Sequence, residues 1–221
     1  MFKENGLWHG FTVNKNGSLT RFEFANGLEN APATQNYPLG LNYPTGVNVI
    51  NENGNFFVFV TVADDNSIAR LDFGNSLLNT PVVNNLGNPN NALFAPRDIT
   101  ILRFCDVIVG FAVNSPDNSN LVRLDFHNDV KGVPDAISLG NMNGNLSFPH
   151  SLSRLFRVGD NVYSFITNVD NRTITRIQFP SCTNASLSSF NGQSPPPIKY
   201  NAPGVYNINL TIDDGLPTQS S

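Results

Sequence analysis

The hydrophobic and polar positions of this chain follow a pattern that recurs four times. Each copy centres on an arginine, and the four anchors, Arg21, Arg70, Arg123 and Arg176, are 49, 53 and 53 residues apart. Each anchor stands in a segment that alternates Leu, Ile or Phe with other residues and ends on phenylalanine, which is typical of an outer β-strand. A near-constant period of this length indicates repeated supersecondary units.

Each unit is predicted to contain four antiparallel strands, here called a, b, c and d. The arginine lies in strand c, and a polar connection rich in Asn, Asp, Gly and Ser joins it to the preceding strand b, as in a β-hairpin. Strand b is densely apolar and has phenylalanine as its fourth residue, at 8–14, 56–62, 108–114 and 162–168. Strand a follows Pro44, Pro96 and Pro149, and strand d ends on Leu-Gly at 39–40, 86–87 and 139–140.

These units predict an all-β fold, a β-propeller. A four-stranded sheet of this size cannot bury both faces alone, whereas radial stacking buries each sheet against its neighbours. A two-sheet sandwich could use similar strands, but it gives no reason for the near-constant period. The propeller is favoured over a sandwich or a solenoid. The predicted blades are 7–40, a partial blade without strand a, then 44–88, 96–141 and 149–180.

The blade count is low, because a closed propeller typically has four to eight blades. The missing first strand predicts that the chain is cut from a longer parent protein that supplies further blades. The N-terminus also lacks the basic start and apolar stretch of a signal peptide. The alternative is that residues 181–221 complete a small ring.

The repeat pattern ends near residue 180. A Ser-rich stretch leads to Pro195, Pro196 and Pro197, a stiff connector. The stretch from Pro203 and Gly204 through Tyr206 to Leu210 and Thr211 resembles the last strand of PKD-type domains. Residues 181–221 are therefore expected to form a linker followed by either a PKD-like strand or a blade-completing strand.

The strand-c motif, the turn at 75–81 and the end at Leu86-Gly87-Asn88 together resemble a known repeat. It is similar to the NHL-like propeller repeats of large secreted proteins of gliding bacteria, in which propellers precede PKD-type domains. This resemblance implies an extracellular or cell-surface location and a scaffold or adhesion role.

Charge and composition exclude some partners. The formal net charge is −4, and the 13 Lys and Arg residues are scattered singly. Without a basic face, nucleic acid and anionic membrane surfaces are not expected partners. The longest apolar run, 56–60, is too short to span a bilayer, so no membrane insertion is expected.

The loops between strands b and c, and those that lead into strand a, are expected to form one face, called here the loop face. This face differs in every blade, as recognition requires. Clustered Asp and Asn oxygens can hold Ca²⁺, but these residues are also the standard turn formers. No cofactor is therefore expected, with calcium as the alternative. The candidate binding residues are Asn42, Tyr43, Thr45, Asp64, Asp65, Arg97, Asp98, Asp117, His150 and Asp170.

Other residues have predicted structural roles. Arginine recurs with an acidic residue two positions later, at Arg21/Glu23, Arg70/Asp72 and Arg123/Asp125, whereas Arg176 is followed by Gln178. Recurrence in every blade favours a ladder of ion pairs between outer strands over a binding site. Cys105 and Cys182 fall on the same face of adjacent blades, so a disulfide and two free thiols both remain open.

The sequence leaves three functions open. The first is a non-catalytic adhesion or binding scaffold for a glycan or protein ligand, which the absence of a catalytic cluster favours. The second is a propeller hydrolase or lyase with a site at the axis, which requires Arg97, Asp98 and His150 to converge. The third is a purely structural spacer. We do not expect this protein to be an enzyme.

Overall fold

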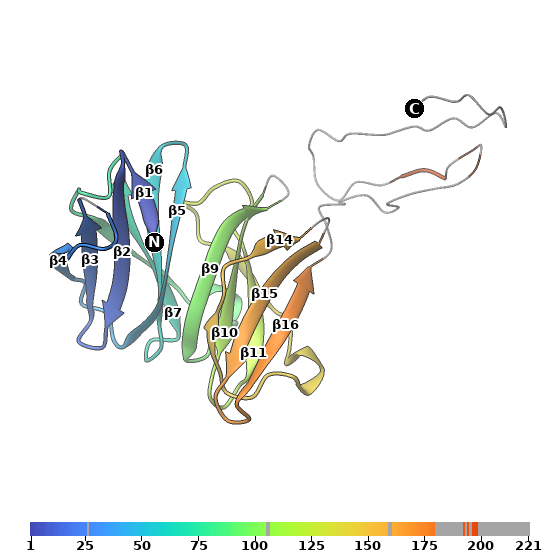
Figure 1. The fold of residues 1–221 in the computed structure, drawn as a ribbon. Helices are drawn as coiled ribbons and strands as arrows, with labels where there is room; N and C mark the ends of the chain where they lie inside the picture. The colour runs from blue at the N-terminus through green and yellow to red at the C-terminus, as the bar shows by residue number, and fades with distance from the viewer. Residues whose placement is uncertain are drawn as a thin grey trace. The chain divides into compact units, whose positions relative to one another are not determined.

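The computed structural model describes residues 1–25, 27–104, 107–158 and 161–179, together with 192, 194 and 196–198. The strands among the described residues lie in the first compact unit, Met1–Ser181. They form four small antiparallel sheets that stand in a ring, like the blades of a four-bladed β-propeller (Figure 1). The all-β propeller prediction is thus confirmed. No helix within the described residues is long and apolar enough to cross a membrane.

The blades follow one another along the chain. Blade 1 contains β1 (Phe2–Glu4), β2 (Leu7–Asn14), β3 (Ser18–Phe24) and β4 (Ala33–Pro38). Blade 2 contains β5 (Pro44–Glu52), β6 (Asn55–Val62), β7 (Ser67–Gly74) and β8 (Val82–Gly87). Blade 3 contains β9 (Pro96–Phe104), β10 (Val107–Asn114), β11 (Asn120–Asp125) and β12 (Asp135–Ser138). Blade 4 contains β13 (Pro149–Leu152), β14 (Phe156–Val158), β15 (Asn161–Asn168) and β16 (Thr173–Phe179).

Blade 1 corrects one prediction, because its strand a is present as β1. This three-residue strand pairs with β2 across Asn5 and Gly6, which have φ angles of 47° and 87°. Two positive φ values are what a type I′ hairpin turn requires, and Asn-Gly is its preferred sequence. The blade therefore begins at Phe2 and not at residue 7.

Blade 4 differs from the other three. Its strand a is interrupted, so that β13 pairs with the end of β15 and β14 pairs with its beginning. Strand c, β16, pairs with the other side of β15. Within residues 149–158 and 161–179 this blade has no strand d.

The core consists of the contacts between blades. Within the described residues, separate hydrophobic clusters join blades 1 and 2, blades 2 and 3, and blades 3 and 4. The middle strands β6 and β10 are buried at every position except the first, because a neighbouring sheet covers each face. This explains why strand b is densely apolar instead of alternating.

One aromatic contact recurs at every joined pair of blades. The fourth residue of strand b packs against the phenylalanine that stands three residues after the arginine of the next blade. The ring centroids are 5.8 Å apart for Phe11 and Phe73, 5.1 Å for Phe59 and Phe126, and 4.5 Å for Phe111 and Phe179. Aromatic pairs in this range contribute about 0.5–1.5 kcal/mol beyond their buried area.

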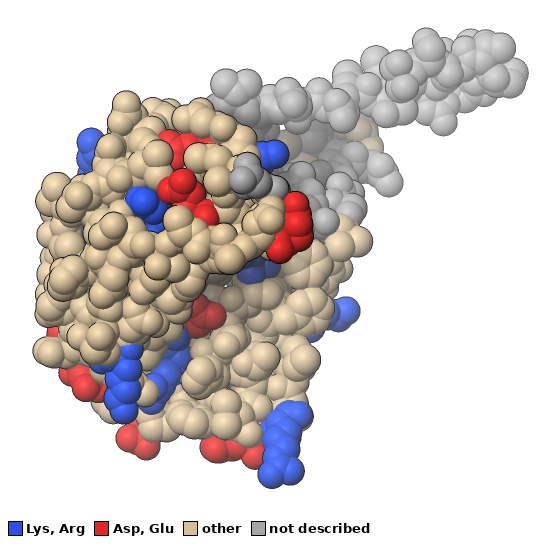
Figure 2. Space-filling view, turned by 60° about the vertical axis from the view of Figure 1, so that its left-hand side comes forward, with Lys and Arg blue, Asp and Glu red and all other residues tan. Residues whose placement is uncertain are grey.

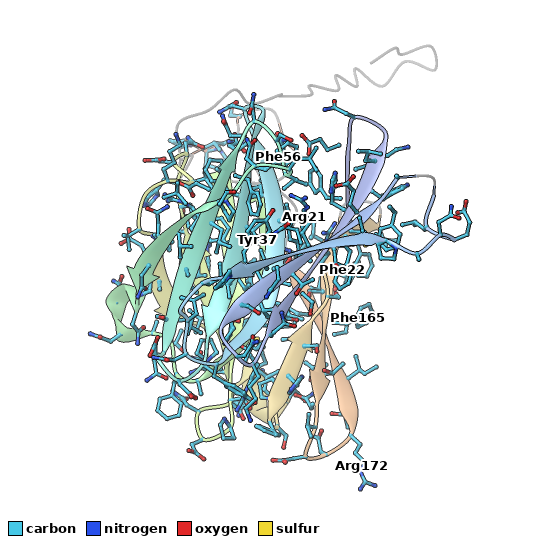
Figure 3. All side chains as sticks on the ribbon, turned by 90° about the vertical axis from the view of Figure 1, so that its left-hand side faces the viewer. Arg21, Phe22, Tyr37, Phe56, Phe165 and Arg172 are labelled. Carbon is cyan, nitrogen blue, oxygen red and sulfur yellow. The ribbon has the colours of Figure 1, made fainter. Side chains whose placement is uncertain are left out.

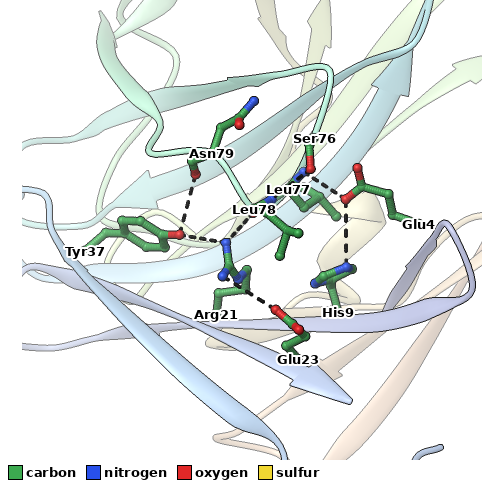
Figure 4. Close-up of polar contacts among 9 residues, drawn as sticks. All are labelled: Glu4, His9, Arg21, Glu23, Tyr37, Ser76, Leu77, Leu78 and Asn79. Atoms are coloured by element: carbon green, nitrogen blue, oxygen red, sulfur yellow. Dashed lines mark hydrogen bonds and ion pairs between the residues drawn. The ribbon is translucent and has the colours of Figure 1, made fainter. Parts of the chain in front are cut away.

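The strand-c arginine also links neighbouring blades. Arg21 donates from Nη1 to the carbonyl of Leu77 in blade 2 at 2.5 Å and to the Tyr37 hydroxyl at 2.8 Å (Figure 4). Arg70 likewise donates to the carbonyls of Val130, at 3.2 Å, and Lys131 in blade 3. The acceptors Leu77 and Val130 occupy the same place in the repeat, seven residues after the arginine of their own blade. Arg21 and Arg70 therefore fix blades 1 and 2 to the loop that follows strand c of the next blade.

The predicted ladder of ion pairs between outer strands takes a different form. Each ion pair joins an arginine to the acidic residue of its own strand, with distances of 3.7 Å for Arg21–Glu23 and 2.6 Å for Arg70–Asp72. Alternate residues share one face of a strand, which allows this pairing. The acidic residue thereby orients the guanidinium toward the next blade.

His9 lies buried beside the first of these contacts. Its ring is 0% exposed, neither ring nitrogen has a hydrogen-bond partner, and Nε2 is 3.8 Å from a Glu4 carboxylate oxygen (Figure 4). Burial lowers the pKa of His9 below its usual 6.5, although Glu4 and Glu23 oppose this shift. The unfolded chain therefore takes up a proton on His9 at a higher pH than the folded chain does.

We expect a pH-dependent loss of stability that depends on His9. As the pH falls below about 6.5, the unfolded state gains a proton that the folded state resists, so this contribution to the free energy of unfolding declines. The free energy of unfolding can be measured by urea unfolding at several pH values between about 5 and 8. It should change less with pH for His9→Gln than for the unchanged chain. Replacing the exposed His150 by Gln is the control. If His9→Gln has the same pH dependence of stability as the unchanged chain, the pH effect does not come from His9.

Gly46 provides a test of the contact between blades 2 and 3. A Cβ atom on Gly46 would lie 2.5 Å from the Cα of Asp98, whereas a Cβ on Gly132 would come no closer than 3.5 Å to its neighbours. Gly46→Ala should lower the free energy of unfolding by about 1–3 kcal/mol, because β5 and β9 must separate. Gly132→Ala should change it little, and equal effects in urea titrations would contradict the close approach.

Candidate functional site

The loop face contains two kinds of loop at the same end of each sheet. The first residue of strand a pairs with the last residue of strand b in blades 2, 3 and 4, at Pro44–Val62, Pro96–Asn114 and Pro149–Asn168. The loops that join strand d to strand a, called d–a loops, therefore lie beside the b–c loops. The basic and acidic side chains visible in Figure 2 are scattered among a majority of uncharged residues.

Each d–a loop ends in the same unusual conformation. The residue before the proline has a positive φ angle, 56° at Tyr43, 39° at Ala95 and 50° at Phe148. Such angles cost free energy in residues other than glycine and persist only when the surroundings impose them. Here the carbonyls of Tyr43 and Phe148 accept from Ala63 and Val169, at 3.0 Å and 3.1 Å.

The preceding blade also holds these loops in place. The amide of Ala95 donates to the Asn66 side chain of blade 2 at 2.7 Å, and the amide of Phe148 donates to the Ser119 hydroxyl of blade 3 at 3.1 Å. Both acceptors lie in b–c loops. The loop face is therefore a hydrogen-bonded surface that spans blades.

Asn114 is a buried bracket for one d–a loop, and the sequence analysis did not single it out. Its side chain, in a residue that is 0% exposed, accepts from the amide of Phe94 and donates to the carbonyl of Ala92 and to Asn120. Asn168 repeats this role in blade 4 by accepting from the amide of Ser147. An asparagine at the end of strand b was the available signal.

Two predicted binding residues, Tyr43 and Arg97, form a row with two neighbours on the loop face. The Lys15 ammonium is 5.1 Å from the Tyr43 ring centroid, and the Arg97 guanidinium is 5.8 Å from the ring centroids of both Tyr43 and Phe148. The row joins Arg97, at the start of β9, to residues of three loops, and Arg97 is half-buried within it. We call Lys15, Tyr43, Arg97 and Phe148 the cation–aromatic row.

Two other predicted site residues have structural partners. The half-buried Asp98 accepts hydrogen bonds from the amides of Ile99 and Leu152, at 2.9 Å and 2.8 Å. Burial raises the pKa of Asp98, and these amides and His150 partly oppose the shift. Thr45 donates to the carbonyl of Pro96 at 2.6 Å. Both side chains thus connect the strands nearest the axis.

The remaining predicted residues line the rim of the loop face. Asp64, Asp117, Asp170 and His150 are exposed. Asn42 donates to Asp65 at 2.8 Å, which ties a d–a loop to a b–c loop. Among the described residues, no three His, Cys, Asp or Glu side chains come together as a metal site would need.

The opposite end of the axis holds a cavity that the sequence analysis missed. It measures about 470 Å³ and is lined by residues of β1, β5 and β9, by the turn after β5, and by Arg154 and Leu155 between β13 and β14. Its polar lining includes the ion pair between Arg103 and Glu52, and also Arg154, which donates to the carbonyl of Met1 at 3.4 Å. Only the ring brings these residues together.

The predicted pair of Arg123 and Asp125 is present, whereas the two cysteines considered for a disulfide lie outside the described residues. Arg123 pairs with Asp125 at 3.0 Å, and His127 lies 3.2 Å from Asp135, in a surface cluster on blade 3. Cys105 and Cys182 lie outside the described residues, as do the strand predicted at 203–212 and most of the segment 181–221.

The fold defines the class as a β-propeller-like protein. No protein-family model matches the chain, and no curated protein matches it.

We expect Asn114→Ala to destabilise the protein by about 1–3 kcal/mol, because it leaves buried amide and carbonyl groups unpaired. Urea unfolding monitored by circular dichroism measures this difference. Asn36→Ala, at an exposed position of the edge strand β4, is the matched control and should stay within about 0.5 kcal/mol of the unchanged chain. A neutral Asn114→Ala would show that the bracket is not needed.

Proposed function

We propose that this protein is a non-catalytic binding scaffold whose loop face holds a glycan or protein ligand, in adhesion at a cell surface or outside the cell. The cation–aromatic row is the observation that carries the proposal. The extracellular location rests on the resemblance of the strand-c motif to secreted NHL-like repeats.

The composition of the row supports recognition. Tyrosine and arginine are enriched among the residues that dominate binding energies, because they combine apolar area with directed polar groups. Exposed Asp, Asn and His side chains surround the row, as in the polar rim of an interface. The strand contacts repeat from blade to blade, whereas the residue before the proline of strand a changes from Tyr43 to Ala95 to Phe148.

The rigidity of the loops favours the same function. Hydrogen bonds from neighbouring blades hold Ala95 and Phe148 in place before any ligand binds. A preorganised surface loses less conformational entropy on binding. This is what a recognition surface on a propeller needs.

The contacts of Asp98 weigh against the alternative hydrolase or lyase. A general base needs a carboxylate free to take a proton from substrate. Both oxygens of Asp98 accept backbone amides, and Arg97 lies between two aromatic rings. These contacts favour a structural role for both residues.

The test compares variants on an array of defined glycans and a matched array of purified extracellular proteins. Tyr43→Asn and Phe148→Asn remove a ring of the row but keep the positive φ angle, which asparagine tolerates. Each should reduce binding by roughly tenfold or more, as loss of a central contact does. The measurement is the signal of each bound ligand across a concentration series.

Val82→Asn is the matched control, because Val82 is 64% exposed on β8, the outer strand of blade 2. It should leave the signals unchanged. A ligand that binds all variants equally would place the site elsewhere. No ligand on either array would favour the structural spacer.

A further inference from the structure

Blades 1 and 4, the first and last along the chain, each have one face that carries half of the contact joining neighbouring blades, without its partner. At blades 1 and 2 and at blades 2 and 3, one blade contributes a strand-b phenylalanine and a strand-c arginine, and the next contributes a phenylalanine and the loop after its strand c. Blades 3 and 4 share the phenylalanine pair. Blade 4 has the first half in Phe165 and Arg176, and blade 1 has the second half in Phe24 and Leu28. The exposure and charge of these two faces indicate what could cover them.

The free half on blade 4 is exposed and apolar. Phe165 is 38% exposed, whereas its equivalents Phe59 and Phe111 are 0% and 6% exposed. The next residue of β15, the fully buried Ile166, lies on the opposite face of the strand. Figure 3 labels Phe165 on blade 4. Beside it, Ile174 is 68% exposed, and a hollow of about 670 Å³ between them is lined by blade 4 residues alone.

The free half on blade 1 is exposed at the corresponding place. Leu28 stands seven residues after Arg21, as Leu77 and Val130 do after the arginines of their blades. Leu77 is 0% and Val130 4% exposed, because the preceding blade covers them, but Leu28 is 49% exposed. Leu28, Phe165 and Ile174 are all uncovered in one chain, so blade 1 does not cover these residues of blade 4, although Arg154 reaches the carbonyl of Met1 near the axis.

The charges of the two halves are complementary. Arg176 is exposed, is followed by Gln178 where blades 1 to 3 have an acidic residue, and forms no ion pair among the described residues. It lies 5.6 Å from the Tyr163 ring centroid. On blade 1, the exposed Glu29 follows Leu28 and has no ion pair there either. Docking would place this carboxylate next to the uncompensated guanidinium.

We propose that the free face of blade 4 binds blade 1 of a second copy of this chain, head to tail. Phe165 packs on Phe24 of the second copy, Leu28 fills the hollow beside Ile174, and Arg176 contacts the loop at Leu28 and Glu29. The contact is heterologous, so it forms a closed ring of copies if the rotation closes and an open chain otherwise. This assembly goes beyond the proposed function and does not depend on a ligand at the loop face.

Light scattering after size-exclusion chromatography tests the proposal over a wide range of protein concentration. The unchanged chain should shift from monomer to multiples of the monomer mass as the concentration rises. Ile174→Arg should weaken this association by roughly tenfold or more, because it places a charge in the apolar contact. Ile137→Arg is the matched control, at a 60% exposed isoleucine of β12, and should associate normally.

A charge exchange separates a contact between copies from misfolding. Arg176→Glu and Glu29→Arg should each weaken association about two- to fivefold, and the double variant should restore it. Circular dichroism confirms that each variant folds. A monomer at every concentration would overturn the proposal and favour a different partner, and so would equal effects of Ile174→Arg and Ile137→Arg or a double variant without rescue.

Discussion

The structure depends on the packing of each sheet against the next. None of the four sheets can bury both faces by itself, and the fully buried positions of β6 and β10 exist only because neighbouring blades cover them. The repeated phenylalanine pair supplies apolar area at each joined interface. The arginine adds direction, because its fork of donors reaches backbone carbonyls of a particular loop in the next blade.

The blades therefore share a repeated strand geometry, whereas their loops differ. Contacts between strands b and c repeat along the chain, so the blades have similar frames. The d–a loops hang on these frames and differ in sequence, yet Asn66, Ser119, Asn114 and Asn168 hold them through hydrogen bonds. The loops can then vary in sequence without disturbing the core.

The same repetition explains why the terminal blades matter. An interior blade uses both halves of the inter-blade contact, whereas the outward faces of blades 1 and 4 each retain one half. Exposed phenylalanine, isoleucine and leucine at such faces are costly in water, since contiguous apolar patches favour association. The packing that joins neighbouring blades therefore also leaves apolar surface on the outward faces of blades 1 and 4, which favours association with a similar blade.

The sequence by itself determined the period, the strands and the propeller class, because alternation, turn residues and the arginine anchors are local signals. It also contained Asn5-Gly6, the hairpin signal for β1, although a three-residue strand with Lys3 and Glu4 has too little apolar pattern to stand out. Only the tertiary structure decided that Arg21 and Arg70 reach the next blade, that Asp98 accepts amides near the axis, and that Glu52 and Arg103 line a cavity. The physical reason is that these partners lie about one repeat apart, so their contact depends on how the sheets stack and not on any local pattern.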